Sequence, residues 1–295
     1  MHQAGQLNEQ SAVRSLELGD VRLTYVVDGA MAMLPSAFFP GFDPAYWADR
    51  PDALDGSGRV PMTAGGLLVE RDGRSLLIDA GLGPVSGPVH VVDDVVGHSD
   101  SGALLEVLTR LGHAPEDIEA VAFTHLHVDH TGWAFSPDKT FPRARYLVAA
   151  AEWAPHDCGT VVPGAPAAEI LTRIGEAHTP VDDDQEIFPG VRTLVTPGHS
   201  PGHTSYVITA GSERVVVLGD VFHTPAQLVH PEWPSRPDMD HAGVTAGRRR
   251  IAAELARPHT IGFAFHFGDQ TFGRLTGDRW EPVPTTALLP PPKTL

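Results

Sequence analysis

Residues 124–130 read Thr-His-Leu-His-Val-Asp-His and directly follow a short apolar stretch that predicts a buried strand. Side chains alternate faces along an extended segment, so His125 and His127 point the same way at the end of that strand. Asp129 and His130 follow where the chain turns. Imidazole nitrogens and carboxylate oxygens are ligands that Zn²⁺ and similar ions accept. The stretch therefore predicts a metal site, with a second ion within reach of the first.

Three more candidate ligands each follow a predicted apolar strand. They are His199 in Thr-Pro-Gly-His, Asp220 after Val-Val-Val-Leu-Gly, and His266 after Ile-Gly-Phe-Ala-Phe. A carboxylate at the end of a buried strand is costly unless it is paired or bound to a metal. Together with the cluster at 125–130, each of the three becomes a predicted ligand.

These motifs, in this order between residues 66 and 266, resemble those of the metallo-β-lactamase superfamily. The resemblance implies an α+β fold, a four-layer αββα sandwich, with metal ions at one edge of its two sheets. It implies two divalent ions, zinc being favoured and Mn, Co or Fe also suiting these ligands. One ion is assigned to His125, His127 and His199, the other to Asp129, His130 and His266, with Asp220 bridging the two.

The resemblance further implies that Asp79, in Leu-Ile-Asp-Ala-Gly, orients a ligating His by accepting its second ring N–H. The catalytic residues are then Asp129, Asp220 and His223, with a metal-bridging hydroxide as nucleophile. The flanks Leu-Gly-Asp-Val-Phe-His and Phe-Ala-Phe-His-Phe resemble the branch of methyl parathion hydrolase and the N-acyl homoserine lactonases. Those lactonases often have Tyr where this chain has His223, which disfavours acyl-homoserine lactones as the natural substrate. We expect His223 to act as an acid or an oxyanion donor.

The function that this resemblance predicts is hydrolysis of an ester, lactone or phosphotriester. The alternatives on the same fold are a metal-dependent phosphodiesterase or nuclease, an iron-dependent oxidoreductase of the persulfide dioxygenase or flavo-di-iron type, and a polyketide thioesterase–cyclase. The chain has 21 Lys and Arg against 37 Asp and Glu, a formal charge of −16. Nucleic-acid binders usually carry a basic stripe, so this balance argues against a nuclease.

The 295 residues, 42% of them hydrophobic, can bury a sizeable core. The single cysteine, Cys158, excludes a disulfide framework. The sequence shows neither a run of 18 apolar residues nor the pattern of a signal peptide. We therefore expect a cytoplasmic enzyme that acts on a small molecule, with no nucleic-acid or membrane partner and with a homodimer as one arrangement.

We expect a single domain over residues 1–295. Residues 1–16 are predicted to be a loose arm, residues 31–62 a lid or interface loop, residues 84–100 irregular, and residues 282–295 a Pro-rich irregular tail. Strands are predicted at 21–27, closed by an Asp-Gly turn, and at 66–70, 75–78, 118–123, 144–149, 193–196, 204–209, 214–218 and 261–265. Helices are predicted over 104–111 and 241–256, the second with Asp240 as N-cap.

Aromatic side chains near the predicted ligands suggest an apolar pocket for an aryl or acyl group. The residues assigned to it are Trp153, Phe222, Phe38 and Trp133. His203 is interpreted as structural within its turn. Arg248–Arg250 is interpreted as a solvated helix face rather than a phosphate-binding group.

Overall fold

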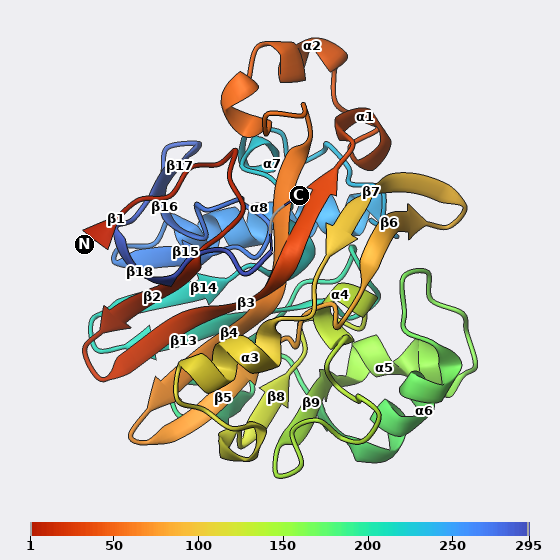
Figure 1. The fold of residues 1–295 in the computed structure, drawn as a ribbon, viewed down its shortest axis with the longest axis vertical. Coiled ribbons are helices and arrows are strands. Elements are labelled where there is room, and N and C mark those ends of the chain that lie inside the picture. The colour runs from red at the N-terminus through yellow and green to blue at the C-terminus, as the bar shows by residue number, and fades with distance from the viewer. Residues whose placement is uncertain (1, 294) are drawn as a thin grey trace.

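The computed structural model describes residues 2–293 and 295, and in this part of the chain the strands form two sheets (Figure 1). The larger, 11-stranded sheet has the order β1(His2–Gln3), β18(Thr285–Leu289), β2(Val13–Leu18), β3(Val21–Met33), β4(Val60–Arg71), β5(Arg74–Ile78), β8(Ala120–Ala122), β9(Arg145–Ala149) and β10(His178–Val181), with β7(Asp94–Asp100) on β3 and β6(Ser86–Val91) on β7. The 7-stranded sheet has the order β11(Glu186–Phe188), β12(Val191–Val195), β13(Thr204–Ala210), β14(Glu213–Val217), β15(Thr260–Phe263), β16(Phe272–Thr276) and β17(Arg279–Pro282).

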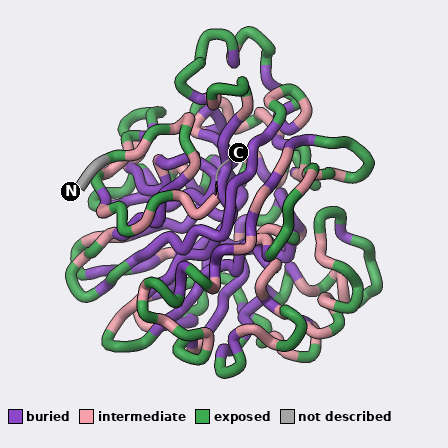
Figure 2. The backbone as a smooth tube through the Cα atoms, in the orientation of Figure 1, coloured by how far each residue is buried: buried purple, intermediate pink, exposed green. Residues whose placement is uncertain are grey.

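In the described part of the chain, the four longer helices pack against the two sheets, and the four shorter ones, of four or five residues, lie in the segments that connect strands. The helices are α1(Pro35–Phe38), α2(Pro44–Ala48), α3(Leu104–Arg110), α4(Val128–Thr131), α5(Ala150–Asp157), α6(Ala168–Ala177), α7(Ala226–Val229) and α8(His241–Leu255). Helix α3 packs against β3, α5 and α6 against β9, and α8 against β14, β15 and β16. Buried residues concentrate between the sheets, and the exposed ones lie in the peripheral loops and turns (Figure 2). The predicted αββα arrangement is confirmed.

The main core joins the inner faces of both sheets. Tyr25 of β3 lies edge-on to Phe263 of β15, with ring centroids 5.2 Å apart. The hydroxyl of Tyr206, on β13, donates to the carbonyl oxygen of Phe123 at 2.6 Å. Burial of this apolar surface drives the sheets together. The buried hydroxyl of each tyrosine donates a hydrogen bond to a backbone carbonyl oxygen.

The connectivity brings the predicted ligands to one edge of the sandwich. Strand β5 pairs in parallel with β8, and β14 pairs in parallel with β15. Parallel neighbours end at the same edge of a sheet, the edge at which α/β proteins place their sites. The chain leaves β8 towards His125, β14 towards Asp220 and β15 towards His266.

Both terminal predictions need correction. The loose arm predicted over residues 1–16 is wrong for residues 2–3, which form β1, and for residues 13–16, because Val13–Leu18 forms β2 and Arg14 is buried in an ion pair with Asp269. The irregular tail at 282–295 contains β18, which lies between β1 and β2. These strands are short and find their partners far along the chain, so local pattern does not reveal them. Residues 1 and 294, which fall within these two predictions, lie outside the described residues.

Two segments predicted as loops are also partly regular. Residues 31–62 begin in β3 and end in β4, with α1, α2 and a 3₁₀ turn between them. Residues 84–100 contain the antiparallel hairpin of β6 and β7, which is wrongly predicted as irregular. The strands predicted at 66–70 and 75–78 are confirmed and pair antiparallel as part of β4 and β5. Also confirmed are α3, α8 and the Asp240 cap, whose side chain accepts from the Ala242 amide.

Among residues 2–293 and 295, the structure contains no helix with the length and hydropathy that a bilayer crossing requires.

Asp28 does not close a turn after residue 27, because β3 continues through a bulge at this position to Met33. Its buried carboxylate instead accepts hydrogen bonds from the backbone amides of Leu82, Gly83 and Leu104 and from the indole of Trp133. One side chain thereby fixes the loop after β5 and the first turn of α3. Burial raises the pKa of this carboxyl, and the hydrogen bonds oppose that shift.

We predict that Asp28→Ala lowers the free energy of unfolding by about 3 kcal/mol or more, because several buried donors lose their acceptor. Urea denaturation of the variant measures the loss. Asp20→Ala is the control, since it removes only a half-exposed partner of Arg71 and should cost less than about 1 kcal/mol. Equal stability of the two variants would contradict the role given to Asp28.

Candidate metal centre

The motif at 124–130 folds as its pattern predicts. The chain leaves β8, stays extended through His127 (φ −75°, ψ 158°), and then enters the single turn of α4, which carries Asp129 and His130. His125 and His127 therefore point to the same side. The rings of His125 and His130 also approach each other, with centroids 4.2 Å apart.

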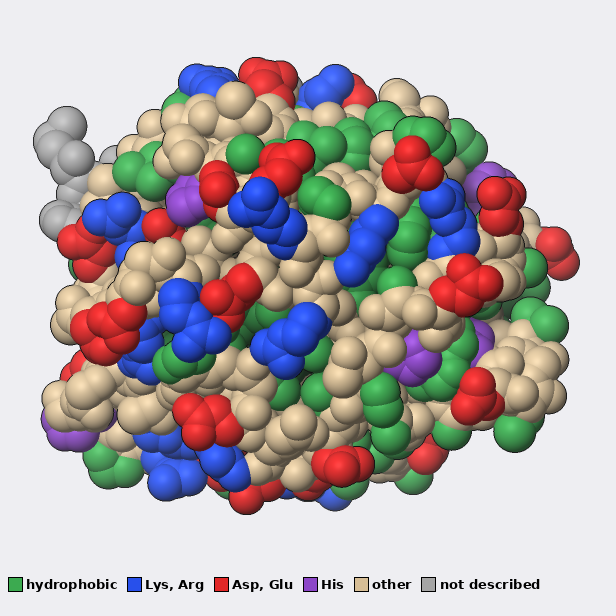
Figure 3. All heavy atoms as spheres, turned by 90° about the horizontal axis from the view of Figure 1, so that it is seen from below, with side chains coloured by type: hydrophobic (Ala, Val, Ile, Leu, Met, Phe, Trp, Pro, Cys, Tyr) green, Lys and Arg blue, Asp and Glu red, His purple; other side chains and the backbone are tan. Residues whose placement is uncertain are grey.

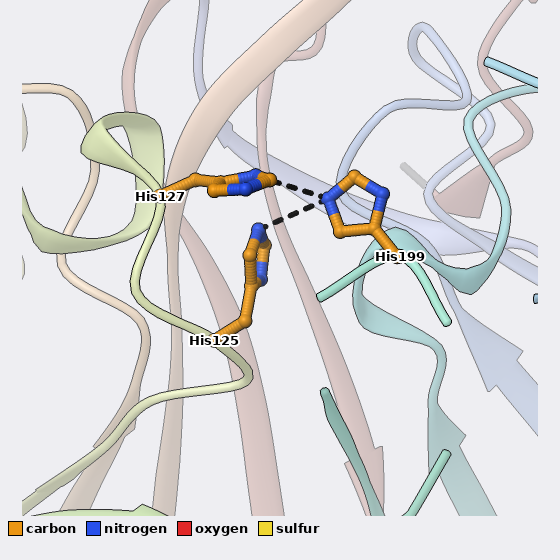
Figure 4. Close-up of side chains that lie close together, drawn as sticks. All are labelled: His125, His127 and His199. Atoms are coloured by element: carbon orange, nitrogen blue, oxygen red, sulfur yellow. Dashed lines mark hydrogen bonds between the residues drawn. The ribbon is translucent and has the colours of Figure 1, made fainter. Parts of the chain in front are cut away.

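Three histidines form the first group of candidate ligands. The Nε2 atom of His199 lies 3.2 Å from Nε2 of His125 and 3.0 Å from Nδ1 of His127. All three side chains are buried, and their nitrogens point at one another (Figure 4). His199 comes from the turn after β12, more than 70 positions away from the motif in sequence.

Asp129, His130, Asp220 and His266 form the second group, with ligand atoms within 4.8 Å of one another. The Oδ1 atom of Asp220 lies 3.2 Å from Nε2 of His130 and 3.1 Å from Nε2 of His266. Its Oδ2 atom lies 3.5 Å from Nε2 of His199 in the first group. Asp220 therefore faces both groups, one oxygen to each. All seven predicted ligands are brought together at this place.

The ring nitrogen that faces away from the cluster makes a hydrogen bond to the protein. This bond decides whether the other ring nitrogen, which faces the cluster, carries a lone pair or a proton. The hydroxyl of Thr124 donates to Oδ2 of Asp79 at 2.8 Å, so it accepts from Nδ1 of His125 at 3.0 Å. Asp79 also accepts from Nδ1 of His130 at 2.7 Å. With Nδ1 carrying the proton, Nε2 of both rings presents a lone pair to the centre.

The same arrangement holds for His199 and His266. Nδ1 of His199 donates to Oδ1 of Asp238 at 2.9 Å, and Nδ1 of His266 donates to the backbone oxygen of Thr63 at 3.2 Å. Each of these rings then directs the Nε2 lone pair inward. Oxygen acceptors thus fix four rings in one tautomer, as is usual for metal-binding histidines.

The electrostatics of the two groups differ. Burial, reinforced by His199, lowers the pKa of His127 to about 3, so this ring is neutral near pH 7. Burial also disfavours a charge on His130, but Asp220, Asp129 and Asp79 outweigh it and raise the pKa of that ring well above its usual value. Positive charge is therefore strongly favoured beside the carboxylates of the second group.

The residues fit divalent cations. Nε2 of His130 and Oδ1 of Asp220 are buried and have no hydrogen-bond partner in the described part of the chain. Converging lone pairs and carboxylate oxygens repel one another unless a cation lies between them. Three nitrogens in one group, and nitrogens with carboxylates in the other, match the preferences of zinc and its neighbours.

Glu152 is a buried carboxylate that the sequence interpretation missed. It accepts from the Leu126 amide at 3.0 Å, from the Ser200 hydroxyl at 2.7 Å and from the Gly202 amide at 2.8 Å. It therefore ties the loop that carries His125 and His127 to the loop that carries His199. Its position in α5, remote from every motif, gives no sequence signal for this role.

The interpretation of Arg248 as part of a solvated face is wrong. Its side chain is fully buried, and its guanidinium donates to Oδ2 of Asp238 at 2.9 Å and to the backbone oxygens of Val221 and Trp233. Asp238, which sequence analysis also missed, in turn holds His199. The hydrogen bond from His199 and the charge of Arg248 outweigh the burial of Asp238 and lower its pKa strongly.

His203 and His223 flank the seven candidate ligands. Nε2 of His203 accepts from the Asp220 amide at 2.9 Å, and burial lowers the pKa of this ring to about 3, consistent with the structural role predicted for it. Nε2 of His223 lies 3.1 Å from Oδ2 of Asp220. Burial lowers the pKa of His223 against the opposing effect of Asp220.

A cavity of about 390 Å³ opens above the second group, and Asp129, Asp220, His223 and His266 lie in its wall. The rest of the wall is mostly apolar and comes from β3, β4, α1, the β6–β7 hairpin and the start of α6. Its apolar side chains include Met31, Met33, Phe38, Met62, Val89, Val91, Phe135 and Ile170. A volume of this size suits a small ligand.

Of the four aromatic residues predicted for a pocket, only Phe38 lies in this wall. Phe222 is fully buried in the hydrophobic cluster that includes Ile251 and Leu255 of α8. Trp133 packs against the main core and donates to Asp28. Trp153 lies on α5 against His178, where its indole donates to Asp157. The prediction is wrong for these three residues, since sequence proximity to a ligand does not fix side-chain direction.

Comparison with known proteins gives a consistent result. Residues 66–260 match the family model of the metallo-beta-lactamase superfamily. An N-acyl homoserine lactonase of Bacillus cereus is 32% identical over 165 residues, which cover 51% of this chain and 60% of that protein. The metallo-beta-lactamase domain-containing protein 1 of Mus musculus is 34% identical over 140 residues, which cover 47% of this chain and 46% of that protein. The chain therefore spans about half the length of the curated relatives it matches.

Among solved structures, the dizinc quorum-quenching lactonase AidC, in complex with a product, superposes with a TM-score of 0.76. The match covers 95% of this chain and 99% of that chain at 22% identity. At this identity the likeness shows the fold alone.

We predict that Arg248→Gln lowers the free energy of unfolding by about 3–5 kcal/mol, because Asp238 is left as a buried charge without its partner. Arg249→Gln, at the exposed neighbouring position, is the matched control and should leave stability unchanged. Thermal and urea unfolding of both variants measure the difference. A similar decrease in the free energy of unfolding for both variants would contradict the role given to the buried Arg248–Asp238 pair.

We predict that His127→Ala and Asp220→Ala each lower the bound metal per chain and reduce turnover by more than about 100-fold. Loss of a residue that only hydrogen-bonds to a ligand costs up to about 100-fold in metal affinity or activity, so loss of a ligand itself should cost more. Elemental analysis of purified protein gives the metal content. His113→Ala, which changes a histidine paired with Glu70 in another part of the fold, is the control. Full metal content in either ligand variant would refute the assignment.

Proposed function

The chain belongs to the metallo-β-lactamase superfamily, and from this premise we propose that it is a metal-dependent hydrolase of neutral, largely apolar esters, lactones or phosphotriesters. The observation that carries the proposal is the cavity wall, where the candidate ligands meet an apolar surface without any Lys or Arg among the described lining residues.

We assign one divalent cation to His125, His127 and His199, and a second to Asp129, His130 and His266, with Asp220 shared. Zinc is our choice of metal. Two such ions supply an activated water as nucleophile and an electrophile for the carbonyl or phosphoryl oxygen of the substrate. The candidate ligands would hold such ions rigidly, because Asp79, Thr63 and Asp238 fix the orientations of the His130, His266 and His199 rings from behind.

The absence of basic side chains from the described wall favours uncharged substrates. A phosphodiester or carboxylate in the cavity would meet the proposed cations on one side only, because the rest of the described wall is mostly apolar and offers no Arg or Lys to bind a charged group. An aryl or acyl group, in contrast, finds the methionines of β3 and β4 and the ring of Phe38. Flexible methionine side chains adapt to differently shaped apolar groups.

His223 and Asp220 are the residues we assign to the movement of protons near the scissile bond. Both lie in the cavity wall, and Nε2 of His223 is 3.1 Å from Oδ2 of Asp220. An N–H at this position can stabilise negative charge that develops on a substrate oxygen. A lactone substrate is further supported by the relatives named as N-acyl homoserine lactonases.

A nuclease or phosphodiesterase is less well supported. In addition to the lack of Lys and Arg in the described cavity wall, the face of the molecule seen in Figure 3 carries acidic and basic side chains interspersed rather than a basic stripe. Phosphate-backbone recognition depends on clustered positive charge.

We predict that neutral substrates are hydrolysed with kcat/KM at least about 100-fold above that of an aryl phosphodiester, a difference of about 2.7 kcal/mol, because the described wall around the proposed cations is mostly apolar and has no Lys or Arg for an anionic group. The panel comprises an aryl ester, a lactone series, a phosphotriester, the phosphodiester and a β-lactam, tested on purified protein of known metal content. Within the lactone series, each added methylene should raise kcat/KM about fourfold until the cavity is filled. Preferred turnover of the phosphodiester would overturn the proposal.

A further inference from the structure

The segment 231–239, between α7 and α8, connects two histidines of the site to the protein interior. Asp238 in this segment binds Nδ1 of His199, and the hydroxyl of Ser235 lies 3.0 Å from Nδ1 of His223. The two are linked to each other, because the Ser235 amide donates to Oδ2 of Asp238 at 2.7 Å. Ser235 is buried and belongs to no motif found in the sequence.

Gln227 determines the direction of the hydrogen bonds that reach His223. Its Oε1 atom accepts from the backbone amide of His223 at 2.8 Å, which orients the other end of the amide towards Ser235. The Nε2 group of Gln227 then donates to the Ser235 hydroxyl at 2.9 Å and to the Trp233 carbonyl at 3.0 Å. The Ser235 oxygen is therefore an acceptor towards Gln227.

The Ser235 hydroxyl has its own proton to donate. Among the described residues its hydrogen-bond neighbours are Gln227, which is a donor, and Nδ1 of His223. The proton therefore goes to His223, so that Nδ1 is the acceptor and the ring proton of the neutral imidazole sits on Nε2. That N–H points at Oδ2 of Asp220, 3.1 Å away, within the cavity wall.

This arrangement is the reverse of that at the candidate ligands. His125, His130, His199 and His266 each donate from Nδ1 to an oxygen and turn the Nε2 lone pair to the centre. His223 accepts at Nδ1 and turns an Nε2–H to the centre. For these five rings, the partner behind the ring thus separates the histidines that can bind a cation from the one that can donate a hydrogen bond. His127 differs from them, because its Nδ1 faces the centre and its Nε2 has no hydrogen-bond partner among the described residues.

We propose that Ser235, oriented by Gln227, is a positioning residue that fixes His223 as the Nε2–H tautomer, and so makes His223 a hydrogen-bond donor to the substrate oxygen that gains negative charge. The catalytic part of this proposal rests on the hydrolase function proposed above. The tautomer itself follows from the hydrogen-bond network and is measurable without any substrate.

Long-range ¹⁵N–¹H correlation spectra of the zinc-loaded protein test the tautomer. The His223 resonances are identified by their loss in His223→Gln. We expect Nδ1 of His223 in the range of an unprotonated ring nitrogen and Nε2 in the range of a protonated one. Ser235→Ala should shift His223 to Nδ1–H or to a mixture, and Ser235→Thr, which keeps the hydroxyl, should restore the wild-type pattern. A wild-type ring protonated on Nδ1 overturns the proposal.

Steady-state kinetics on the best substrate of the panel test the consequence. We expect Ser235→Ala to reduce kcat by about 10–100-fold with KM and metal content nearly unchanged, and Ser235→Thr to recover most of the rate. Ser15→Ala, which removes another buried hydroxyl on β2, should retain the wild-type rate and spectrum.

The two measurements separate the possible failures. An unchanged kcat in Ser235→Ala overturns the role of the tautomer in catalysis. If no member of the panel is hydrolysed, the proposed function fails, whereas the spectra still decide the tautomer of His223.

Discussion

The structure depends on one electrostatic constraint, the convergence of buried lone pairs and carboxylate oxygens on a small volume. Asp220 lies at its centre, with one oxygen 3.1 Å from His266 and the other 3.5 Å from His199. Such a cluster is unfavourable in a protein interior unless positive charge is held within it. The cations we propose meet this requirement, and the rest of the fold keeps their ligands from relaxing apart.

That restraint comes from buried polar side chains outside the motifs. Glu152 joins the two loops that supply the first group of histidines, and Asp79 joins His130 to the end of β5. Asp238, held by the buried Arg248, fixes the ring of His199 from the opposite side. Each acceptor also selects a tautomer, so the same hydrogen bonds that stabilise the fold prepare the nitrogens for their chemistry. The apolar cavity above the cluster then limits which substrates can reach it.

Prediction from the sequence was most reliable where the pattern is local. The alternation in Thr-His-Leu-His, the apolar runs before Asp220 and His266, and the cap at Asp240 all predict what the structure contains. It was least reliable where a side chain or strand depends on a distant partner. The β2–β18 pairing joins the two ends of the chain, and the burial of Arg248 depends on a carboxylate ten positions earlier, in a loop that has no sequence pattern.

The sequence by itself determined the fold family and the identity of the seven candidate ligands, because ligand type, spacing and order along strands are properties of short segments. Only the tertiary structure decided which nitrogen of each ring faces inward, which aromatic side chains line the cavity, and that no basic group does so among the described residues. These features depend on contacts between segments far apart in the chain. A residue's neighbours in sequence do not reveal the acceptor behind its ring or the direction in which its side chain packs.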